Sequence, residues 1–132
     1  MKGLDTNVLL RLLLRDDADE AARAQRFVER AAAEAPLWIN RVVLVELVWV
    51  LESGYRYRRQ EVAGILANLL RTKSFMIEGA EEAWAAFRRY RDVRADFADC
   101  LIGATNRAAG CAETATFDRA AAALPGFVVL GA

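Results

Sequence analysis

The sequence contains no histidine and, among its 132 residues, only two cysteines and two lysines. Without histidine the chain cannot build a Ser-His-Asp triad, a Cys-His pair or a histidine-ligated zinc site. The paired histidines that cleave RNA by acid–base chemistry are excluded for the same reason. Cys100 and Cys111 form no C-x-x-C pair, so we interpret them as reduced, small apolar residues. Any hydrolytic chemistry must therefore come from carboxylates, together with an ion that prefers oxygen ligands.

Long hydrophobic runs and an excess of either charge are also missing. The longest apolar run, Val42 to Leu51, is interrupted by Glu46 and is too short to span a bilayer. The first residues become polar too early for a signal peptide, so we expect a cytoplasmic protein without membrane contact. Eighteen basic and eighteen acidic side chains cancel. The net charge therefore gives no indication of a nucleic-acid partner.

What remains is a globular composition with a regular alternation of patterns. The chain is 55% hydrophobic and 27% charged, and its length predicts a single domain over residues 1–132. Short apolar runs alternate with amphipathic stretches, which predicts an α/β fold with a mainly parallel central sheet. We expect four to five short strands with helices on both faces. The first expected strand ends at Asp5, and the others cover 37–39, 75–77, 112–116 and 127–130. The expected helices cover 7–15, 18–34, 42–51, 60–72, 80–91 and 96–109, and a helical turn follows Asp118.

Four acids stand out against this pattern. Asp5 and Asp118 follow expected strands, Glu46 lies inside an almost wholly apolar helix, and Asp99 lies one turn into another helix. A buried, isolated carboxylate is costly, so Glu46 needs an arginine partner, a partly exposed position or a cation. Asp5, Asp96 and Asp118 can equally be helix caps, with Asp99 a favourable first-turn acid. From the residues alone, the structural and the functional interpretations both stay open.

The functional interpretation requires these acids to converge. In a parallel sheet the carboxyl ends of the strands are where ligand sites gather. Three or four carboxylates without histidine would bind one or two Mg²⁺ or Mn²⁺ ions. Two such ions ~3.5–4 Å apart can clamp the attacking and leaving oxygens of a phosphodiester. Cleavage of this kind would leave a 5′-phosphate and a 3′-hydroxyl and would not need the RNA 2′-OH.

Four segments, in this order and spacing, resemble the PIN domain family, and most of all the VapC-type toxins of bacterial and archaeal toxin–antitoxin pairs. The resemblance covers essentially the whole chain, and the ordered set is far more specific than any one motif. The segments are Leu4-Asp5-Thr6-Asn7-Val8-Leu9-Leu10-Arg11, Val45-Glu46-Leu47-Val48-Trp49-Val50-Leu51, Asp96-Phe97-Ala98-Asp99-Cys100-Leu101-Ile102 and Thr114-Ala115-Thr116-Phe117-Asp118.

The resemblance implies a three-layer α/β/α fold and a Mg²⁺- or Mn²⁺-dependent endoribonuclease acting as the toxin of a toxin–antitoxin system. It also implies a homodimer and a cognate VapB-like antitoxin. No position of the acidic pattern is missing, so nothing argues for an inactive enzyme. By position, Asp5, Glu46 and Asp99 match the core acidic triad, Asp118 matches a more variable fourth acid, Thr6 and Thr116 match hydroxyls that orient these acids, and Asp96 matches a frequent further acid.

Two other enzyme classes fit the sequence poorly, and one non-catalytic function remains as an alternative. A receiver-type phosphotransfer domain needs a lysine near its last strand, and neither Lys2 nor Lys73 fits. An aspartyl phosphatase would want a second aspartate where Asn7 stands. A non-catalytic RNA-binding or scaffold PIN domain remains the alternative, using arginines for phosphate contacts and Tyr55 and Tyr57 for stacking. The arginines concerned are Arg56, Arg58, Arg59, Arg88, Arg89, Arg91 and Arg94.

Overall fold

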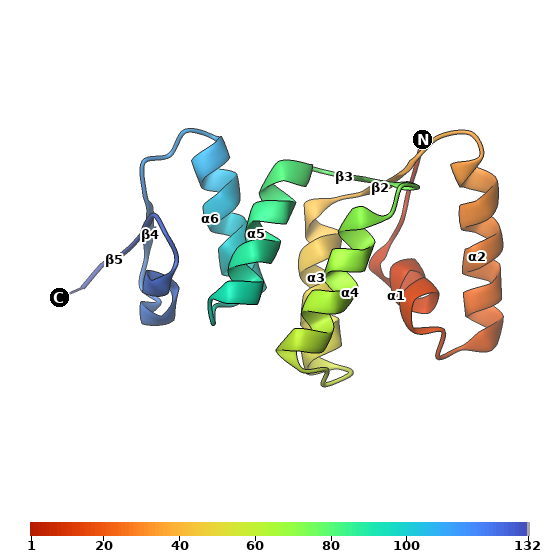
Figure 1. The fold of residues 1–132 in the computed structure, drawn as a ribbon, viewed down its shortest axis with the longest axis horizontal. Helices are drawn as coiled ribbons and strands as arrows, with labels where there is room; N and C mark the ends of the chain where they lie inside the picture. Colours follow the sequence, from red (N-terminus) through yellow and green to blue (C-terminus); the bar gives the residue numbers. More distant parts are fainter. Residues whose placement is uncertain (132) are drawn as a thin grey trace. The chain divides into compact units, whose positions relative to one another are not determined.

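The computed structural model describes residues 1–131 and consists of two compact units, Met1–Glu78 and Gly79–Ala132 (Figure 1). The predicted single domain, whose last residue Ala132 lies outside the described residues, stays a prediction. The first unit contains β1 (Lys2–Gly3), α1 (Thr6–Leu14), α2 (Ala18–Ala32), β2 (Leu37–Ile39), α3 (Arg41–Ser53), α4 (Arg59–Arg71) and β3 (Phe75–Ile77). The second contains α5 (Ala80–Asp92), α6 (Phe97–Ala108), β4 (Thr114–Thr116), the 3-10 helix η1 (Arg119–Ala123) and β5 (Phe127–Val129).

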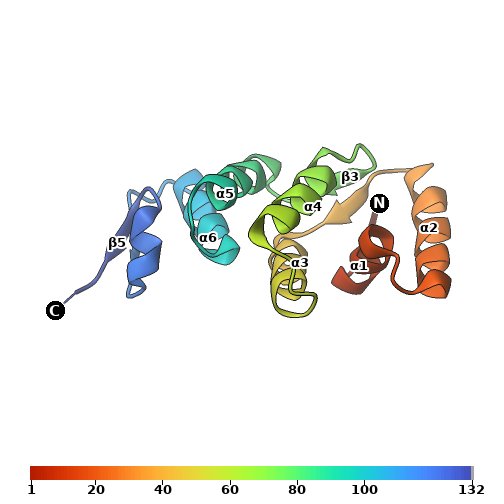
Figure 2. The same cartoon turned by 60° about the horizontal axis from the view of Figure 1, so that its bottom comes forward.

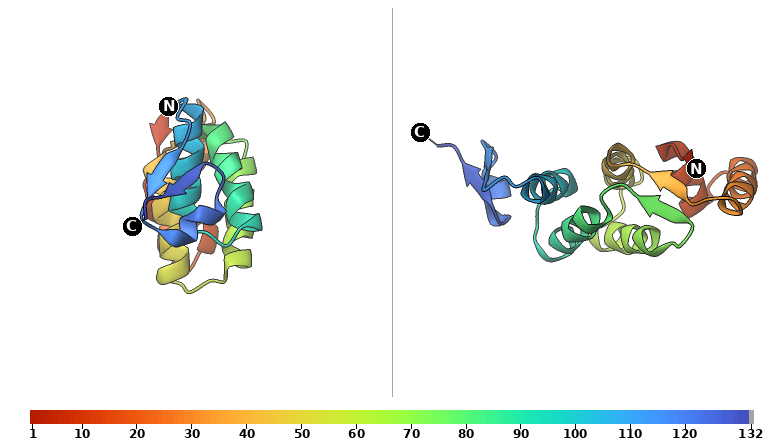
Figure 3. Two further views of the ribbon diagram at one scale, coloured as in Figure 1. Left: turned by 90° about the vertical axis from the view of Figure 1, so that its left-hand side faces the viewer. Right: turned by 90° about the horizontal axis from the view of Figure 1, so that it is seen from above.

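The first unit is built on a three-stranded parallel sheet in the order β1-β2-β3. Lys2 pairs with Leu37, and Leu37 pairs with Phe75 in turn. The arrows of β2 and β3 point the same way in the right-hand view of Figure 3. The ladder continues one residue past β1, because the Leu4 amide donates to the Trp38 carbonyl at 3.1 Å. Helical crossovers connect the strands, as parallel pairing requires.

Leucines and isoleucines from the helices and the sheet form the core of the first unit. Helix α1 packs against α2 and α3, and α3 packs against α4, as Figure 2 shows for the last pair. Each fully buried leucine contributes about 1.5–3 kcal/mol relative to an exposed one. The fully buried side chains of this unit include Leu9, Leu37, Ile39, Leu44, Leu47, Leu51, Leu66 and Leu69.

The second unit pairs two helices with a small parallel sheet. Helices α5 and α6 lie side by side (Figure 1), and small residues such as Ala83 and Ala86 are buried along α5. The rings of Tyr90 and Phe97 meet edge to face with centroids 5.7 Å apart. Strands β4 and β5 pair in parallel. Strand β5 contacts α6 at Gly103, where an added Cβ would lie only 2.7 Å from the Phe127 ring.

The predicted α/β class and the parallel strand pairing are confirmed. The described strands form a sheet of three in the first unit and a sheet of two in the second, so the strand count of a sheet is below the predicted four to five. Most boundaries agree within two residues. The clearest difference is at the start, where β1 ends at Gly3 and α1 begins at Thr6, so that Asp5 is the cap between them. No helix among residues 1–131 is long and apolar enough to cross a membrane.

A polar cluster connects the turn after α1 with the turn after α3. The Tyr55 hydroxyl donates to Asp16 Oδ2 at 2.8 Å, and Arg11 reaches the other Asp16 oxygen at 3.3 Å and Glu20 at 2.5 Å. The hydrogen bond from Tyr55, reinforced by Arg11, lowers the pKa of Asp16, and the same bond to Asp16 raises the pKa of Tyr55. The Tyr55 hydroxyl is therefore used within the fold, while a stacking role for the ring stays a prediction.

Loss of this hydroxyl should lower stability in a pH-dependent way. We expect Tyr55→Phe to lower the Tm by a few degrees between pH 5 and 8. Because the folded-state pKa of Asp16 is depressed, the contribution is present above the unfolded-state pKa and is lost as the pH falls through the folded value. The gap between variant and wild type should then shrink below about pH 4. Thermal unfolding followed by circular dichroism checks this; a gap that stays constant down to pH 2 would contradict it.

Candidate active site

The first predicted acid, Asp5, caps helix α1. Its Oδ1 accepts a hydrogen bond from the Thr6 amide at 2.9 Å, and its backbone is extended, as an N-cap requires. The Asp5 side chain is nevertheless exposed, at the point where the β1 ladder ends. The structural interpretation of Asp5 is thus confirmed, and it does not exclude the functional one. A capping carboxylate uses one oxygen and keeps its charge at the positive end of the helix.

Glu46 is held by the residue that follows Asp5. The Thr6 hydroxyl, in a residue only 6% exposed, donates to Glu46 Oε1 at 2.7 Å. Glu46 itself is exposed, so of the structural alternatives the partly exposed position is right and the buried arginine pair is wrong. The exposure of Glu46 follows from the orientation of α3, whose other face is buried. The buried residues are Val43, Leu44, Leu47, Val48 and Leu51. The helix is therefore buried along one face, although its sequence is almost wholly apolar.

Asp5, Thr6 and Glu46 line one cavity of about 260 Å³ together with Asn7, Trp49 and Val50. Two carboxylates separated by 41 positions in the sequence thus line the same cavity, and the buried Thr6 contacts both of them. The sequence predicted the two acids but not Trp49, which lies one helical turn after Glu46 and is 66% exposed. The i, i+3 spacing was the available signal that both belong to one helix face.

The second unit gathers the other predicted acids around the start of α6. Asp96 is the N-cap of α6 by position, but its side chain makes no capping hydrogen bond, and Asp99 lies half-buried one turn later. Asp118 follows β4 and caps η1, accepting from the Ala120 amide at 2.9 Å. Thr116 Oγ1 accepts from the Asp118 amide at 3.0 Å. Thr6 and Thr116 therefore both make hydrogen bonds to predicted acids, one through a carboxylate and one through the backbone.

Asp96 and Asp118 act electrostatically on Asp99. Burial raises the pKa of the Asp99 carboxyl above its usual value, and the charges of Asp96 and Asp118 raise it further. Among residues 1–131, the causes of this shift are burial and these two negative charges. Like charges held together without a positive partner are the electrostatic condition that a bound cation relieves.

The donor set fits a hard cation, although a complete cage is not present. Every predicted ligand supplies carboxylate oxygen, which Mg²⁺ and Mn²⁺ prefer. Among residues 1–131, no group of three or more acidic or cysteine side chains lies close enough to hold one ion. The two acid groups, Asp5 with Glu46 and Asp99 with Asp96 and Asp118, each lie within one unit. Their joint use of a metal stays a prediction.

Removal of the negative charge of Asp99 should stabilise the metal-free protein. We expect Asp99→Asn to raise the Tm in EDTA at pH 7, because the amide feels no repulsion from Asp96 and Asp118. Since the pKa of Asp99 is raised in the folded state, wild-type stability falls as the pH rises from the unfolded-state value through the folded one. The gain should therefore shrink toward pH 4. Asp92→Asn is the matched control. Arg91 lowers the pKa of Asp92, so removal of the Asp92 charge should lower the Tm. An unchanged or lower Tm for Asp99→Asn would contradict the repulsion.

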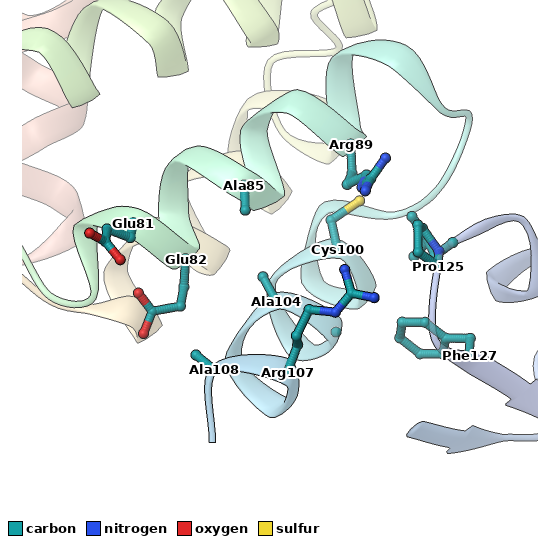
Figure 4. Close-up of a pocket in the computed structure, with 12 residues that line it drawn as sticks. Glu81, Glu82, Ala85, Arg89, Cys100, Ala104, Arg107, Ala108, Pro125 and Phe127 are labelled. Atoms are coloured by element: carbon teal, nitrogen blue, oxygen red, sulfur yellow. The ribbon is translucent and has the colours of Figure 1, made fainter. Parts of the chain in front are cut away.

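Another cavity, of about 230 Å³, lies in the second unit (Figure 4). Arg89 of α5 and Arg107 of α6 line it near Cys100 and Phe127, and Glu81 and Glu82 lie toward its other end. None of the predicted site acids is among its described lining residues. The cavity of about 260 Å³ that Asp5 and Glu46 line is therefore the better candidate for the predicted site.

Some of the arginines predicted to contact phosphate form ion pairs with acids of the same chain. Arg91 forms an ion pair with Asp92 at 2.8 Å and lies over the Phe87 ring, and Arg58 lies 3.5 Å from Glu61. Arg88, Arg89 and Arg94 are exposed. Arg91 and Arg58 thus form ion pairs within the chain, and the use of the predicted arginines for phosphate contacts stays a prediction.

The comparisons with known proteins agree with the family resemblance of the sequence. The family model of the PIN domain matches residues 3–126. The chain belongs to the PIN domain family. This PIN domain is also 29% identical over 119 residues to the VapC ribonuclease of Aquifex aeolicus (strain VF5), covering 90% of this chain and 88% of that protein. The resemblance predicted from the four segments is confirmed. The matched region contains all seven predicted site residues of this PIN domain.

Proposed function

We propose that this PIN domain is a metal-dependent endoribonuclease, the toxin of a VapBC-type toxin–antitoxin pair. The observation that carries the proposal is that Asp5 and Glu46 line one cavity and both accept hydrogen bonds from Thr6, Asp5 from its amide and Glu46 from its hydroxyl. The similarity to a VapC ribonuclease over nine-tenths of the chain supports the same activity.

The proposed ligands are Asp5, Glu46, Asp99 and Asp118, which would hold Mg²⁺ or Mn²⁺. The bound ion would polarise the scissile phosphate and activate the attacking water, leaving a 5′-phosphate and a 3′-hydroxyl. Thr6 fixes one oxygen of Glu46 by hydrogen bonding, so that the carboxylate is oriented before the ion binds. Thr116 fixes the backbone at Asp118 in the same way. Asp96, whose carboxylate is not used in capping, adds negative charge beside Asp99.

The similarity to a VapC ribonuclease also supports a proposal for the partners. We propose RNA as substrate, a VapB-like antitoxin as inhibitor, and a homodimer in the cytoplasm. The apolar residues Val62, Leu66 and Leu69 of α4 are buried inside the first unit. Any face between copies must therefore use other residues.

The testing experiment compares RNA cleavage by the purified chain in Mn²⁺, in Mg²⁺ and in EDTA, with the product ends mapped. We expect cuts that require the metal and carry 5′-phosphates. Cuts that persist in EDTA would point to a contaminant. A chain that binds RNA equally well in EDTA and cuts no RNA would favour the alternative, a non-catalytic RNA-binding PIN domain.

A further inference from the structure

Trp49 is the large apolar side chain beside the carboxylates of the first unit. It is 66% exposed, whereas the neighbours Val48 and Leu51 on the same helix are buried. It lines the cavity of about 260 Å³ with Asp5 and Glu46. A tryptophan normally buries most of its large surface on folding. One left in water beside two acids is therefore a candidate contact for a ligand.

The chemistry of the cavity limits what that ligand is. The carboxylates repel a bare anion and attract a cation, so a phosphate can lie there only with a metal ion. The indole offers a flat apolar face next to them. A nucleotide matches both the carboxylates and the indole, because it carries a phosphate that binds the metal ion and a base that stacks on an aromatic ring. A duplex keeps its bases stacked within the helix, so the ligand must be single-stranded at this point.

A second copy of the chain is a poorer occupant. Trp49 lines the same small cavity as Asp5 and Glu46. A protein surface that covered the indole would close the cavity over the carboxylates and exclude their substrate. Val42 is exposed on the same helix but is not among the residues that line the cavity, and it provides a control for general apolar contact.

We propose that Trp49 is the base-stacking residue of this site and positions a nucleotide of single-stranded RNA beside Asp5 and Glu46. The inference rests on the proposed ribonuclease activity for its kinetic test, but RNA binding tests it without cleavage. Trp49 acts by holding the base, so its loss should weaken binding far more than it slows the chemical step.

The kinetic test compares Trp49→Phe, Trp49→Leu and the control Val42→Ala in Mn²⁺. Base stacking on an aromatic side chain contributes enough for Trp49→Leu to raise KM by about 5- to 100-fold. Trp49→Phe keeps a ring and should lie between Leu and wild type, with kcat within about 3-fold throughout. Val42→Ala should match wild type. An unchanged KM in Trp49→Leu would overturn the proposal.

The binding test uses tryptophan fluorescence and an unstructured single-stranded RNA, with Ca²⁺ replacing Mn²⁺ and intact RNA verified on a gel. A base stacked on indole quenches its emission, so RNA should quench the wild type. The quench should be lost in Trp49→Phe and kept in Trp84→Phe, whose indole packs edge-on against Phe87 in α5. A quench that survives in Trp49→Phe would overturn the proposal.

The outcomes separate the two proposals. Quenching without cleavage would contradict the nuclease and support the role of Trp49. Cleavage with an unchanged KM in Trp49→Leu would support the nuclease alone. If Trp49→Leu and Val42→Ala both converted a dimer to a monomer and raised KM equally, the face would be an interface between copies, and the stacking role would be wrong. A wild type that binds no RNA would overturn it as well.

Discussion

Asp5→Asn should reduce RNA cleavage in Mn²⁺ by at least about 100-fold while leaving the fold intact. Loss even of an outer partner of a metal ligand typically costs about 10- to 100-fold in metal affinity or activity, and Asp5 is a proposed ligand itself. Asparagine caps a helix as well as aspartate does, so the hydrogen bond to the Thr6 amide survives the substitution. The change therefore removes the charge and keeps the local structure. Initial rates of cleavage of a labelled RNA measure the effect.

Asp17→Asn is the matched control, because Asp17 caps α2 in the same unit through the Glu20 amide at 3.0 Å. Both variants should keep a wild-type circular dichroism spectrum, and only Asp5→Asn should lose activity. Equal losses in both would assign the effect to capping, and full activity in Asp5→Asn would remove Asp5 from the site.

The proposed ligands should also act as one unit. If Asp5 and Glu46 hold the same ion, Asp5→Asn with Glu46→Gln should lose little more activity than either single variant. Asp5→Asn with Asp99→Asn extends the same comparison to the acids of the second unit. Losses that multiply in the second pair would mean that Asp99 contributes independently, and the four-carboxylate proposal would then be wrong.

The sequence predicted the parts of this molecule that depend on neighbouring residues. Asn40 accepts a hydrogen bond from the Val43 amide, so the expected start of α3 is confirmed by its cap. Strands 37–39 and 75–77 lie where their apolar triplets indicated. Local caps and short apolar runs carry enough information for these elements, because the interactions that define them lie within a few residues.

Features that depend on distant residues could not be read in this way. The bond from Thr6 to Glu46 joins positions 40 apart, and no local pattern distinguishes it from a solvated pair. Helix α3 is apolar nearly all round, so its sequence did not show that Val42 and Trp49 face outward. Asp96 occupies the expected N-cap position yet makes no capping bond with its side chain, which only the conformation reveals. The candidate site was therefore predictable as a set of acids, and its supporting contacts were not.

Thr6→Val should raise the Mn²⁺ concentration needed for half-maximal cleavage by about 10- to 100-fold. Valine has nearly the shape of threonine and keeps the backbone amide that donates to Asp5, so the cap of α1 is retained. Only the hydroxyl that orients Glu46 is lost. Because Glu46 is exposed, water can solvate its freed oxygen, and the free energy of unfolding should fall by only about 1 kcal/mol. The effect on metal affinity should thus greatly exceed the effect on the fold.

Thr6→Ser separates the hydroxyl from the shape of the side chain, since serine keeps the donor and loses the methyl group. Its metal requirement should stay close to that of the wild type. The rise of Tm with added Mn²⁺ gives a second readout that needs no activity, because an ion that binds the folded state alone stabilises it in proportion to its affinity. In Thr6→Val the rise should begin at a higher Mn²⁺ concentration than in Thr6→Ser. Coincident curves would mean that Glu46 is oriented without Thr6, and that the threonine serves packing alone.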